Sequence, residues 1–205
     1  MITIVDYGVG NLGSIRNMLK KIGEPGRISN SISDIENASK LILPGVGAFD
    51  FCIDMFNKSG LLNIITNKVF EKKTPILGIC VGMQMLTRRS EEGRLPGLAW
   101  IQGETIRFRF SNENKKFRVP HMGWNQVFPA KESALTQDFF TESRFYFVHS
   151  YLVKCDDRND ILLETEYGSR FTSAIEHKNI FGVQFHPEKS HKFGMKLLKN
   201  FCKLD

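Results

Sequence analysis

The first half of the chain alternates short apolar runs with amphipathic stretches, and this alternation restricts the possible fold more than any other feature of the sequence. Alternating strand and helix patterns are typical of an α/β fold in which helices cover both faces of a sheet. The predicted strands are residues 2–6, 27–29, 40–43 and 75–79, and the predicted helices include residues 49–56 and 61–72. We therefore expect an open, mostly parallel, twisted sheet with helices on both faces.

The character of the chain changes after Gly93. Short alternating, β-branched and aromatic segments predict a strand-rich second half that extends or covers the sheet. These segments read IQGETIRFRF, WNQVF, RFYFV, SYLVKC, SAIEH and IFGVQF, and a closing amphipathic helix reads MKLLKNFCKL. No linker or low-complexity stretch separates the two halves. We expect residues 1–205 to form a single domain.

Composition narrows the choice of compartment and partner. The net charge is +6 and the pI about 9.2, but Lys and Arg are interleaved with Asp and Glu, which does not favour a nucleic-acid partner. The cysteines Cys52, Cys80, Cys155 and Cys202 are far apart, which indicates neither a zinc site nor a disulfide framework. Without a signal-like or membrane-spanning apolar stretch, we expect a cytoplasmic protein with no membrane partner and no metal.

The stretch GVGNLG at residues 8–13 matches the G-x-G-x-x-G pattern of dinucleotide-binding loops. Such a site also requires a carboxylate at the end of the second strand. The nearest acid here, Asp34, lies beyond that strand beside a predicted helix. The alternative is a tight strand-to-helix turn in which glycines permit close packing.

Cys80 lies between the predicted strand at 75–79 and a helix-like stretch, VGMQMLTRR. This is the arrangement of a nucleophile elbow, and Gly78 and Gly82 would relieve the crowding of so sharp a turn. The first N–H groups of the helix would favour a thiolate and could stabilise an oxyanion. A buried structural cysteine is the alternative for this segment taken alone.

A thiol nucleophile requires a base, and the chain has five histidines. His186 ends a predicted strand and is followed by Pro187 and Glu188, so a carboxylate lies two residues from the imidazole and could orient it. His149 ends another strand without a nearby carboxylate, and we expect a substrate-adjacent or structural role. His121 lies in a Pro/Gly-rich stretch that we expect to be a loop.

The remaining histidines, His177 and His191, lie among polar residues, where we expect solvent exposure. His186 alone would be as well explained by a structural role. Together with Glu188 and the elbow cysteine, it favours a catalytic triad.

These motifs resemble those of the class I (triad) glutamine amidotransferases. GICVGMQ and FHPEKS carry the triad pattern in the order Cys, His, Glu, while DYGVGNLGS, LPGVGAFD, SEEG, PHMGWN and FVHSY follow the order found in glutaminase subunits of imidazole glycerol phosphate synthases. The resemblance covers essentially the whole chain. It implies hydrolysis of L-glutamine through a γ-glutamyl thioester, with no cofactor.

The resemblance also assigns roles to individual residues. The triad would be Cys80, His186 and Glu188, and the oxyanion would be bound by Val81 and by a loop containing Gly45, Val46 and Gly47. The positions that match glutamine-binding residues are Gln84, Glu92, His149, Ser150 and Tyr151. The positions that match the partner interface and the ammonia path are Asn11, Met122, Trp124, Asn125, Tyr146 and Lys189.

The family resemblance further implies a partner, a (β/α)₈-barrel synthase subunit that forms a heterodimer and receives the ammonia. In that family the loop at residues 8–11 lies at the docking face, so its glycines would serve turn geometry and close approach. Ala99 and Trp100 depart from the family pattern, as does HKFG after HPEKS. These features resemble paralogous subunits that supply ammonia to a related synthase in surface-polysaccharide sugar biosynthesis, which is the alternative acceptor pathway.

Two further hypotheses remain at this stage. An elbow-cysteine peptidase on a similar sheet would not explain the distant HPE segment or SEEG. A nucleotide-binding or scaffold module would depend on GVGNLG alone.

Overall fold

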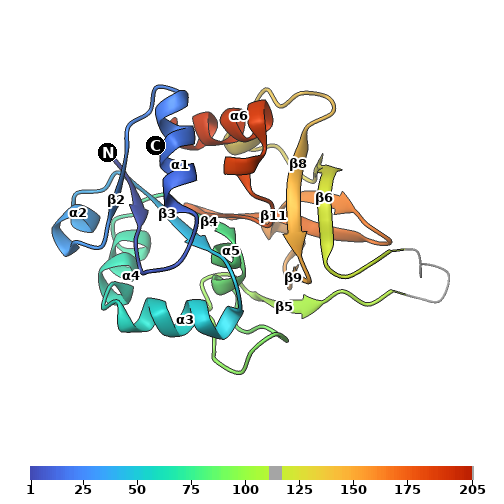
Figure 1. Cartoon of the computed structure of the whole chain (residues 1–205), viewed down its shortest axis with the longest axis horizontal. Helices are drawn as coiled ribbons and strands as arrows, with labels where there is room; N and C mark the ends of the chain where they lie inside the picture. Colours follow the sequence, from blue (N-terminus) through green and yellow to red (C-terminus); the bar gives the residue numbers. More distant parts are fainter. Residues whose placement is uncertain (111–116, 205) are drawn as a thin grey trace.

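A twisted sheet runs through the molecule (Figure 1). The computed structural model describes residues 1–110 and 117–204. The parallel strands are β1 (Ile2–Val5), β2 (Gly26–Ser29), β3 (Lys40–Gly45), β4 (Ile76–Cys80) and β12 (Ile180–Val183). The antiparallel strands are β5 (Gly103–Arg107), β7 (Phe128–Pro129), β9 (Tyr151–Cys155), β10 (Ile161–Glu166) and β11 (Arg170–His177). Within the described residues these ten strands form one sheet, with the spine β2-β1-β3-β4-β12-β11-β10-β7.

The remaining strands and the helices complete the layers. β6 (His121–Gln126) and β8 (Arg144–His149) form a separate antiparallel pair. α1 (Leu12–Lys21) and α6 (His191–Cys202) lie together on one face of the sheet, and α3 (Phe49–Lys58) and α4 (Leu62–Phe70) lie on the other (Figure 1). The shorter elements are α2 (Ile32–Glu36), α5 (Val81–Met85) and the 3-10 turns η2 (Ala134–Thr136), η3 (Arg158–Asp160) and η4 (Pro187–Lys189). The predicted α/β class, with a strand-rich second half, is confirmed.

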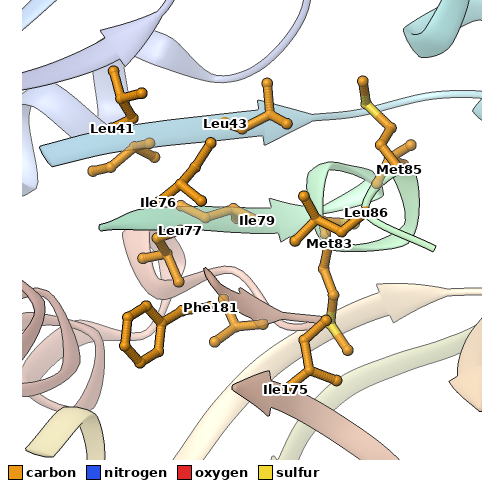
Figure 2. Close-up of a cluster of buried hydrophobic side chains, with 14 of the residues drawn as sticks. Leu41, Leu43, Ile76, Leu77, Ile79, Met83, Met85, Leu86, Ile175 and Phe181 are labelled. Carbon is orange, nitrogen blue, oxygen red and sulfur yellow. The ribbon is translucent and has the colours of Figure 1, made fainter. Parts of the chain in front are cut away.

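The central strands are buried on both faces, which explains why their sequences read as continuous apolar runs. All five residues of β4 are buried. Figure 2 shows Ile76, Leu77 and Ile79 of this strand between Leu43 of β3 and Phe181 of β12, and all of these side chains are at most 4% exposed. Each such side chain contributes roughly 1.5–3 kcal/mol when it is fully removed from water. The sheet that carries the elbow is therefore a rigid support.

Two local predictions were wrong. The helix expected after Cys80 ends at Met85, because the Thr87 hydroxyl and the Thr87 N–H both donate to the Gln84 carbonyl and close a tight turn. His121, expected in a loop, lies in β6 and is only 2% exposed, since its strand pairs residue by residue with β8. Strand β10 was also not foreseen.

The glycine-rich loop at residues 8–13 has a geometric explanation. Gly8 and Gly10 have φ angles of +86° and +117°, which side chains rarely adopt. A Cβ on Gly10 would lie 2.8 Å from Pro44 Cβ. Asp34 is the acid nearest to the position that a dinucleotide site would require. Its carboxylate accepts hydrogen bonds from Arg27 and from the Ser29 hydroxyl. The glycines thus bring this loop against the end of β3.

Alanine substitutions at two glycines test whether the turn at Cys80 requires close contact between α5 and the backbone of β3. A Cβ on Gly82 would lie 2.0 Å from the Leu43 carbonyl oxygen, whereas one on Gly13 would meet nothing within 4 Å. We expect Gly82→Ala to lower the free energy of unfolding by about 2–3 kcal/mol through overpacking, and Gly13→Ala to raise it by up to about 1 kcal/mol through helix propensity. Urea unfolding of both variants measures this, and equal stabilities would contradict the packing account.

Candidate active site

Cys80 lies on a sharp turn between β4 and α5, as the elbow pattern predicts. Its backbone has φ 56° and ψ −113°, a strained conformation for a residue with a side chain. The turn is possible because α5 packs directly on the sheet. A Cβ on Gly78 would lie 2.7 Å from the Gly82 carbonyl oxygen, so both glycines are needed for this contact. The sulfur is consequently held at the carboxyl edge of the parallel strands.

His186 and Glu188 form the hydrogen-bonded pair that the sequence predicts. His186 Nδ1 lies 2.8 Å from Glu188 Oε1, and the two side chains are 4% and 1% exposed. Burial alone lowers the pKa of His186, but hydrogen bonds to Cys80 and Glu188, together with their charges, raise it to about 10. At neutral pH the imidazole is therefore a cation that bridges a sulfur and a carboxylate.

The backbone around His186 is fastened to β8. The His186 N–H donates to the Tyr146 carbonyl at 2.9 Å. The Ser190 hydroxyl donates to the His186 carbonyl at 2.6 Å and accepts from the Tyr146 N–H at 3.0 Å. These bonds fix the imidazole relative to the sheet. Ser190 was not foreseen, because its bond with Tyr146 joins it to another strand.

One cavity of about 410 Å³ joins the predicted residues. It is lined by Val46, Gly47, Cys80, Val81, Gln84, Glu92, Pro120, Val148, His149, Ser150, Tyr151, His186 and Lys189. All five predicted glutamine-binding residues thus share a cavity with Cys80 and His186. Its size suits a small-molecule ligand. Glu188 lies behind His186 rather than in the cavity wall.

The oxyanion loop predicted at residues 45–47, which begins at the last residue of β3, approaches the elbow closely. Gly45 lies beside Cys80 in the register of β3 with β4, and a Cβ on Gly45 would lie 2.5 Å from the Gly82 nitrogen. Gly47 has φ +90°, whereas Val46 is 39% exposed at the cavity. The predicted oxyanion residues Val46, Gly47 and Val81 therefore line the same cavity as Cys80, and Gly45 lies beside Cys80 on the adjacent strand.

Two buried side chains hold this loop, and the sequence analysis missed both. The Tyr7 hydroxyl donates to the Pro44 carbonyl at 2.6 Å, and the Cys52 thiol donates to the Val46 carbonyl at 3.3 Å. Burial raises the pKa of Tyr7 and raises that of Cys52 to about 11, so both groups keep the proton that they donate. The two contacts span 37 and six residues, and no local pattern indicates the longer one.

His149 and His121 form a neutral pair. His149 Nδ1 lies 2.7 Å from the Tyr151 carbonyl, an obligate acceptor, so Nδ1 carries the proton and Nε2 accepts. His121 Nδ1, 3.0 Å away, must then donate to that Nε2, and the Asn125 amide faces His121 Nε2 at 3.4 Å. Burial lowers the pKa of His121 to about 4 and that of His149 to about 3.

The contacts of each histidine decide whether one of its ring nitrogens is free to act as a base. Both nitrogens of His149 are occupied, so it lines the cavity without serving as a base. His177, expected to be exposed, pairs with Asp160 at 2.8 Å and has a side chain that is 43% exposed. His191 stacks on Trp124 with ring centroids 5.6 Å apart. Cys80 therefore has His186 as its basic partner among the histidines.

Two residues of the cavity wall anchor neighbouring elements. Glu92 Oε2 accepts from the Phe49 N–H at 2.9 Å, at the start of α3. The Gln84 amide donates to the Tyr151 carbonyl at 3.3 Å and to Gln184 Oε1 at 3.0 Å. Both hydrogens of that amide are thereby used, which leaves the Gln84 oxygen for a ligand.

The predicted interface residues group near the cavity. Met122 and Trp124 of β6 are 61% and 46% exposed. Lys189 Nζ lies 5.7 Å from the centroid of the Tyr146 ring, and Lys189 also lines the cavity. Neighbouring exposed apolar side chains are typical of a protein-binding face.

The other two predicted interface residues are placed differently. Asn11 is half-buried at the start of α1. The Asn125 amide points inward and donates to the Glu166 carbonyl at 2.9 Å. The role of Asn125 at an interface stays a prediction.

The residues that depart from the family pattern lie elsewhere. Ala99 has φ +55°, the conformation that a glycine would adopt more easily, and Trp100 packs edge-on against Phe70. Neither residue lines the cavity.

In the part of the chain that the structure describes, no three His, Cys, Asp or Glu side chains are grouped as metal ligands, and no helix is long and apolar enough to cross a membrane.

Comparisons with known sequences agree with this geometry. A family model described as glutamine amidotransferase class-I matches residues 3–204. Imidazole glycerol phosphate synthase subunit HisH 2 of Methanococcus maripaludis is 55% identical over 203 residues, which cover 99% of each chain. The protein of the same name in Pseudomonas aeruginosa is 53% identical over 204 residues, which cover 100% of each chain.

Solved structures show the same fold at low identity. A crystal structure titled glutamine amidotransferase superposes with a TM-score of 0.74 at 16% identity and covers 98% of this chain and 97% of that one. The crystal structure of a glutamine amidotransferase from Thermotoga maritima gives a TM-score of 0.65 at 15% identity, with 98% of this chain and 81% of that one covered.

The neutral histidine pair predicts a pH dependence of stability. In the unfolded chain His121 and His149 bind protons near pH 6.5, whereas in the folded chain their pKa values are about 4 and 3. Their contribution to stability is therefore present above pH 6.5 and lost as the pH falls toward 4. We expect the difference in unfolding free energy between the native chain and a His121→Gln/His149→Gln variant to shrink over that range.

Urea unfolding at a series of pH values measures this difference. The control is Asn200→Leu, which removes a buried amide that does not titrate, and we expect its difference from the native chain to stay constant over this range. A difference between native chain and double variant that is constant from pH 7 to pH 4 would contradict the neutral assignment.

Proposed function

The chain belongs to the class-I glutamine amidotransferases, and from this premise we propose that it is the glutaminase subunit of an imidazole glycerol phosphate synthase. It would hydrolyse L-glutamine to glutamate and ammonia and supply the ammonia to histidine biosynthesis. The observation that carries the proposal is the single cavity shared by Cys80, His186 and the residues predicted to bind glutamine. The relatives named HisH support the synthase assignment.

In the first half-reaction the Cys80 thiolate attacks the side-chain carbonyl carbon of glutamine. The tetrahedral oxyanion would accept hydrogen bonds from the Val81 N–H and from the loop at residues 45–47. His186, held as a cation by its two anionic neighbours, gives its proton to the departing nitrogen, and ammonia leaves. The product is a γ-glutamyl thioester on Cys80.

In the second half-reaction the neutral His186 accepts a proton from water, and the resulting hydroxide attacks the thioester. The carbon–sulfur bond breaks, glutamate forms and the sulfur leaves as thiolate beside the reprotonated imidazole. Glu188, 2.8 Å from His186 Nδ1, keeps the ring oriented through both steps. Glutamine and water are thus converted to glutamate and ammonia.

Substrate contacts follow from the free groups of the cavity. Both amide hydrogens of Gln84 are already donated within the protein. The Gln84 oxygen is available to accept a hydrogen bond from an N–H of the substrate. Glu92 presents a carboxylate that suits the substrate ammonium, and the segment from His149 to Tyr151 forms the opposite wall. We assign these residues to glutamine binding.

We further propose that residues 1–205 act as a single domain that docks on a (β/α)₈-barrel synthase subunit. Met122 and Trp124 offer apolar contact area, and Lys189 and Tyr146 lie between that face and the cavity. Ammonia released into water would be protonated and lost to the acceptor reaction, so a dry passage requires a close interface here.

The nucleophile assignment predicts the effect of Cys80→Ala. We expect glutamine turnover to fall by at least about a thousandfold, because the residue that forms the thioester is gone, with an unchanged far-UV spectrum. Cys202→Ala, in α6 and away from the cavity, is the matched control and should retain turnover. Undiminished glutamate release by Cys80→Ala would exclude the mechanism.

The partner assignment predicts that the chain alone is a poor glutaminase. We expect glutamate release to rise steeply when both a barrel-type synthase and its phosphoribulosyl substrate are added, because Val46 and Gly47 of the oxyanion loop line the same cavity as Lys189, which we assign to the docking face. Full activity of the isolated chain would refute this coupling. Stimulation only by a synthase of surface-polysaccharide sugar biosynthesis would replace the histidine pathway with that alternative.

A further inference from the structure

Gln184 is a fully buried amide beside the reactive sulfur. It follows β12 directly, where Val183 pairs with Ile79 of β4, so Gln184 lies level with Cys80 across the two parallel strands. Gln184 is 0% exposed, and its backbone N–H donates to the Ser173 carbonyl at 2.9 Å. A buried amide in an apolar sheet costs free energy unless its polar atoms are bonded.

The orientation of the Gln184 amide is determined by its neighbours. The Tyr151 carbonyl can only accept, so the atom of Gln84 that faces it at 3.3 Å must be the amide nitrogen. That nitrogen also lies 3.0 Å from the Gln184 side chain, which must present its oxygen there. The nitrogen of Gln184 consequently points the other way, toward Cys80.

Gln184 Nε2 lies 3.8 Å from Cys80 Sγ. We propose that Gln184 is a further catalytic residue of the glutaminase reaction, whose amide N–H donates to the Cys80 sulfur and stabilises it as a thiolate. Gln84 is the positioning residue that holds this amide in the donating orientation. The proposal rests on the proposed function, but the contact itself requires neither glutamine nor a synthase partner.

An amide donor complements the imidazolium. His186 supplies a charged donor that gives up its proton when ammonia leaves, whereas the Gln184 amide keeps its hydrogens throughout. During hydrolysis of the thioester the sulfur becomes a thiolate again, after His186 has taken a proton from water. A donor that does not titrate would stabilise the sulfur at that stage, and hydrogen bonds to charged groups are stronger than those to neutral ones.

The sulfur also has titratable neighbours that must be considered in any test. Those linked to it electrostatically or sharing its cavity are Tyr7, Cys52, Glu92, His149, Tyr151, His186 and Lys189, and Glu188 is bonded to His186. None of these is altered by a change at Gln184. Gln184→Met leaves each of these residues in place, although it also removes the oxygen that accepts from Gln84.

The test is the pH dependence of alkylation by iodoacetamide, with the modified Cys80 peptide quantified by mass spectrometry. Burial raises the pKa of Cys52 to about 11 and those of Cys155 and Cys202 to about 12, and the peptides of these cysteines are quantified separately from that of Cys80. Gln184→Met keeps the side-chain length but has no donor. We expect its alkylation midpoint to lie about half to one pH unit above that of the native chain, which corresponds to roughly three- to tenfold less thiolate.

Two further variants separate this role from a structural one. Gln184→Glu keeps the oxygen that accepts from Gln84 but places a carboxylate near the sulfur, and we expect a larger upward shift of the midpoint. Asn200→Leu removes another buried amide, which bonds the carbonyls of Leu135 and Gln137, and we expect no shift. Thermal melts show whether each variant is folded.

Glutaminase kinetics with the synthase partner give the second readout. We expect Gln184→Met to lower kcat by about three- to tenfold with little change in KM, because the amide acts on the sulfur rather than on the substrate. Unchanged alkylation midpoints in both folded Gln184 variants would overturn the proposal. Shifted midpoints in a chain that does not hydrolyse glutamine would uphold the contact and refute the proposed function instead.

Discussion

The direct backbone contact between the elbow and β3 is the constraint on which the site depends. Since Gly82 lies against the Leu43 carbonyl with no room for a side chain, α5 starts immediately above the sheet and Cys80 is held at its carboxyl edge. The adjacent strands β3 and β12 end at the same edge. They bring the predicted oxyanion loop to one side of the sulfur and His186 to the other.

Histidine chemistry in this site is set by what each ring contacts. His186 is buried between a sulfur and a carboxylate, and its pKa rises to about 10. His149 is equally buried, but its partners are a carbonyl and a neutral imidazole, and its pKa falls to about 3. Burial alone disfavours the charged form, so the neighbouring anions decide the outcome. One histidine serves in proton transfer and the other in holding the cavity wall.

Local patterns in the sequence predicted the α/β class and the features that lie within a few residues of each other. The elbow at Cys80 and the spacing of His186 and Glu188 are of this kind. The hydrogen bond from Tyr7 to Pro44 and the amide of Gln184 at the sulfur were not predicted, because they join positions 37 and 104 residues apart. The strand around His121 was missed because its pairing with β8 outweighs its turn-like composition.

The central claim is that glutamine is hydrolysed through a thioester on Cys80, and trapping that species tests it most directly. The chain with its synthase partner would be mixed with glutamine, quenched in acid within the first turnover and digested for mass spectrometry. The account predicts one glutamyl group on the peptide that contains Cys80. Release of glutamate with no such adduct, or with the adduct on another cysteine, would contradict it.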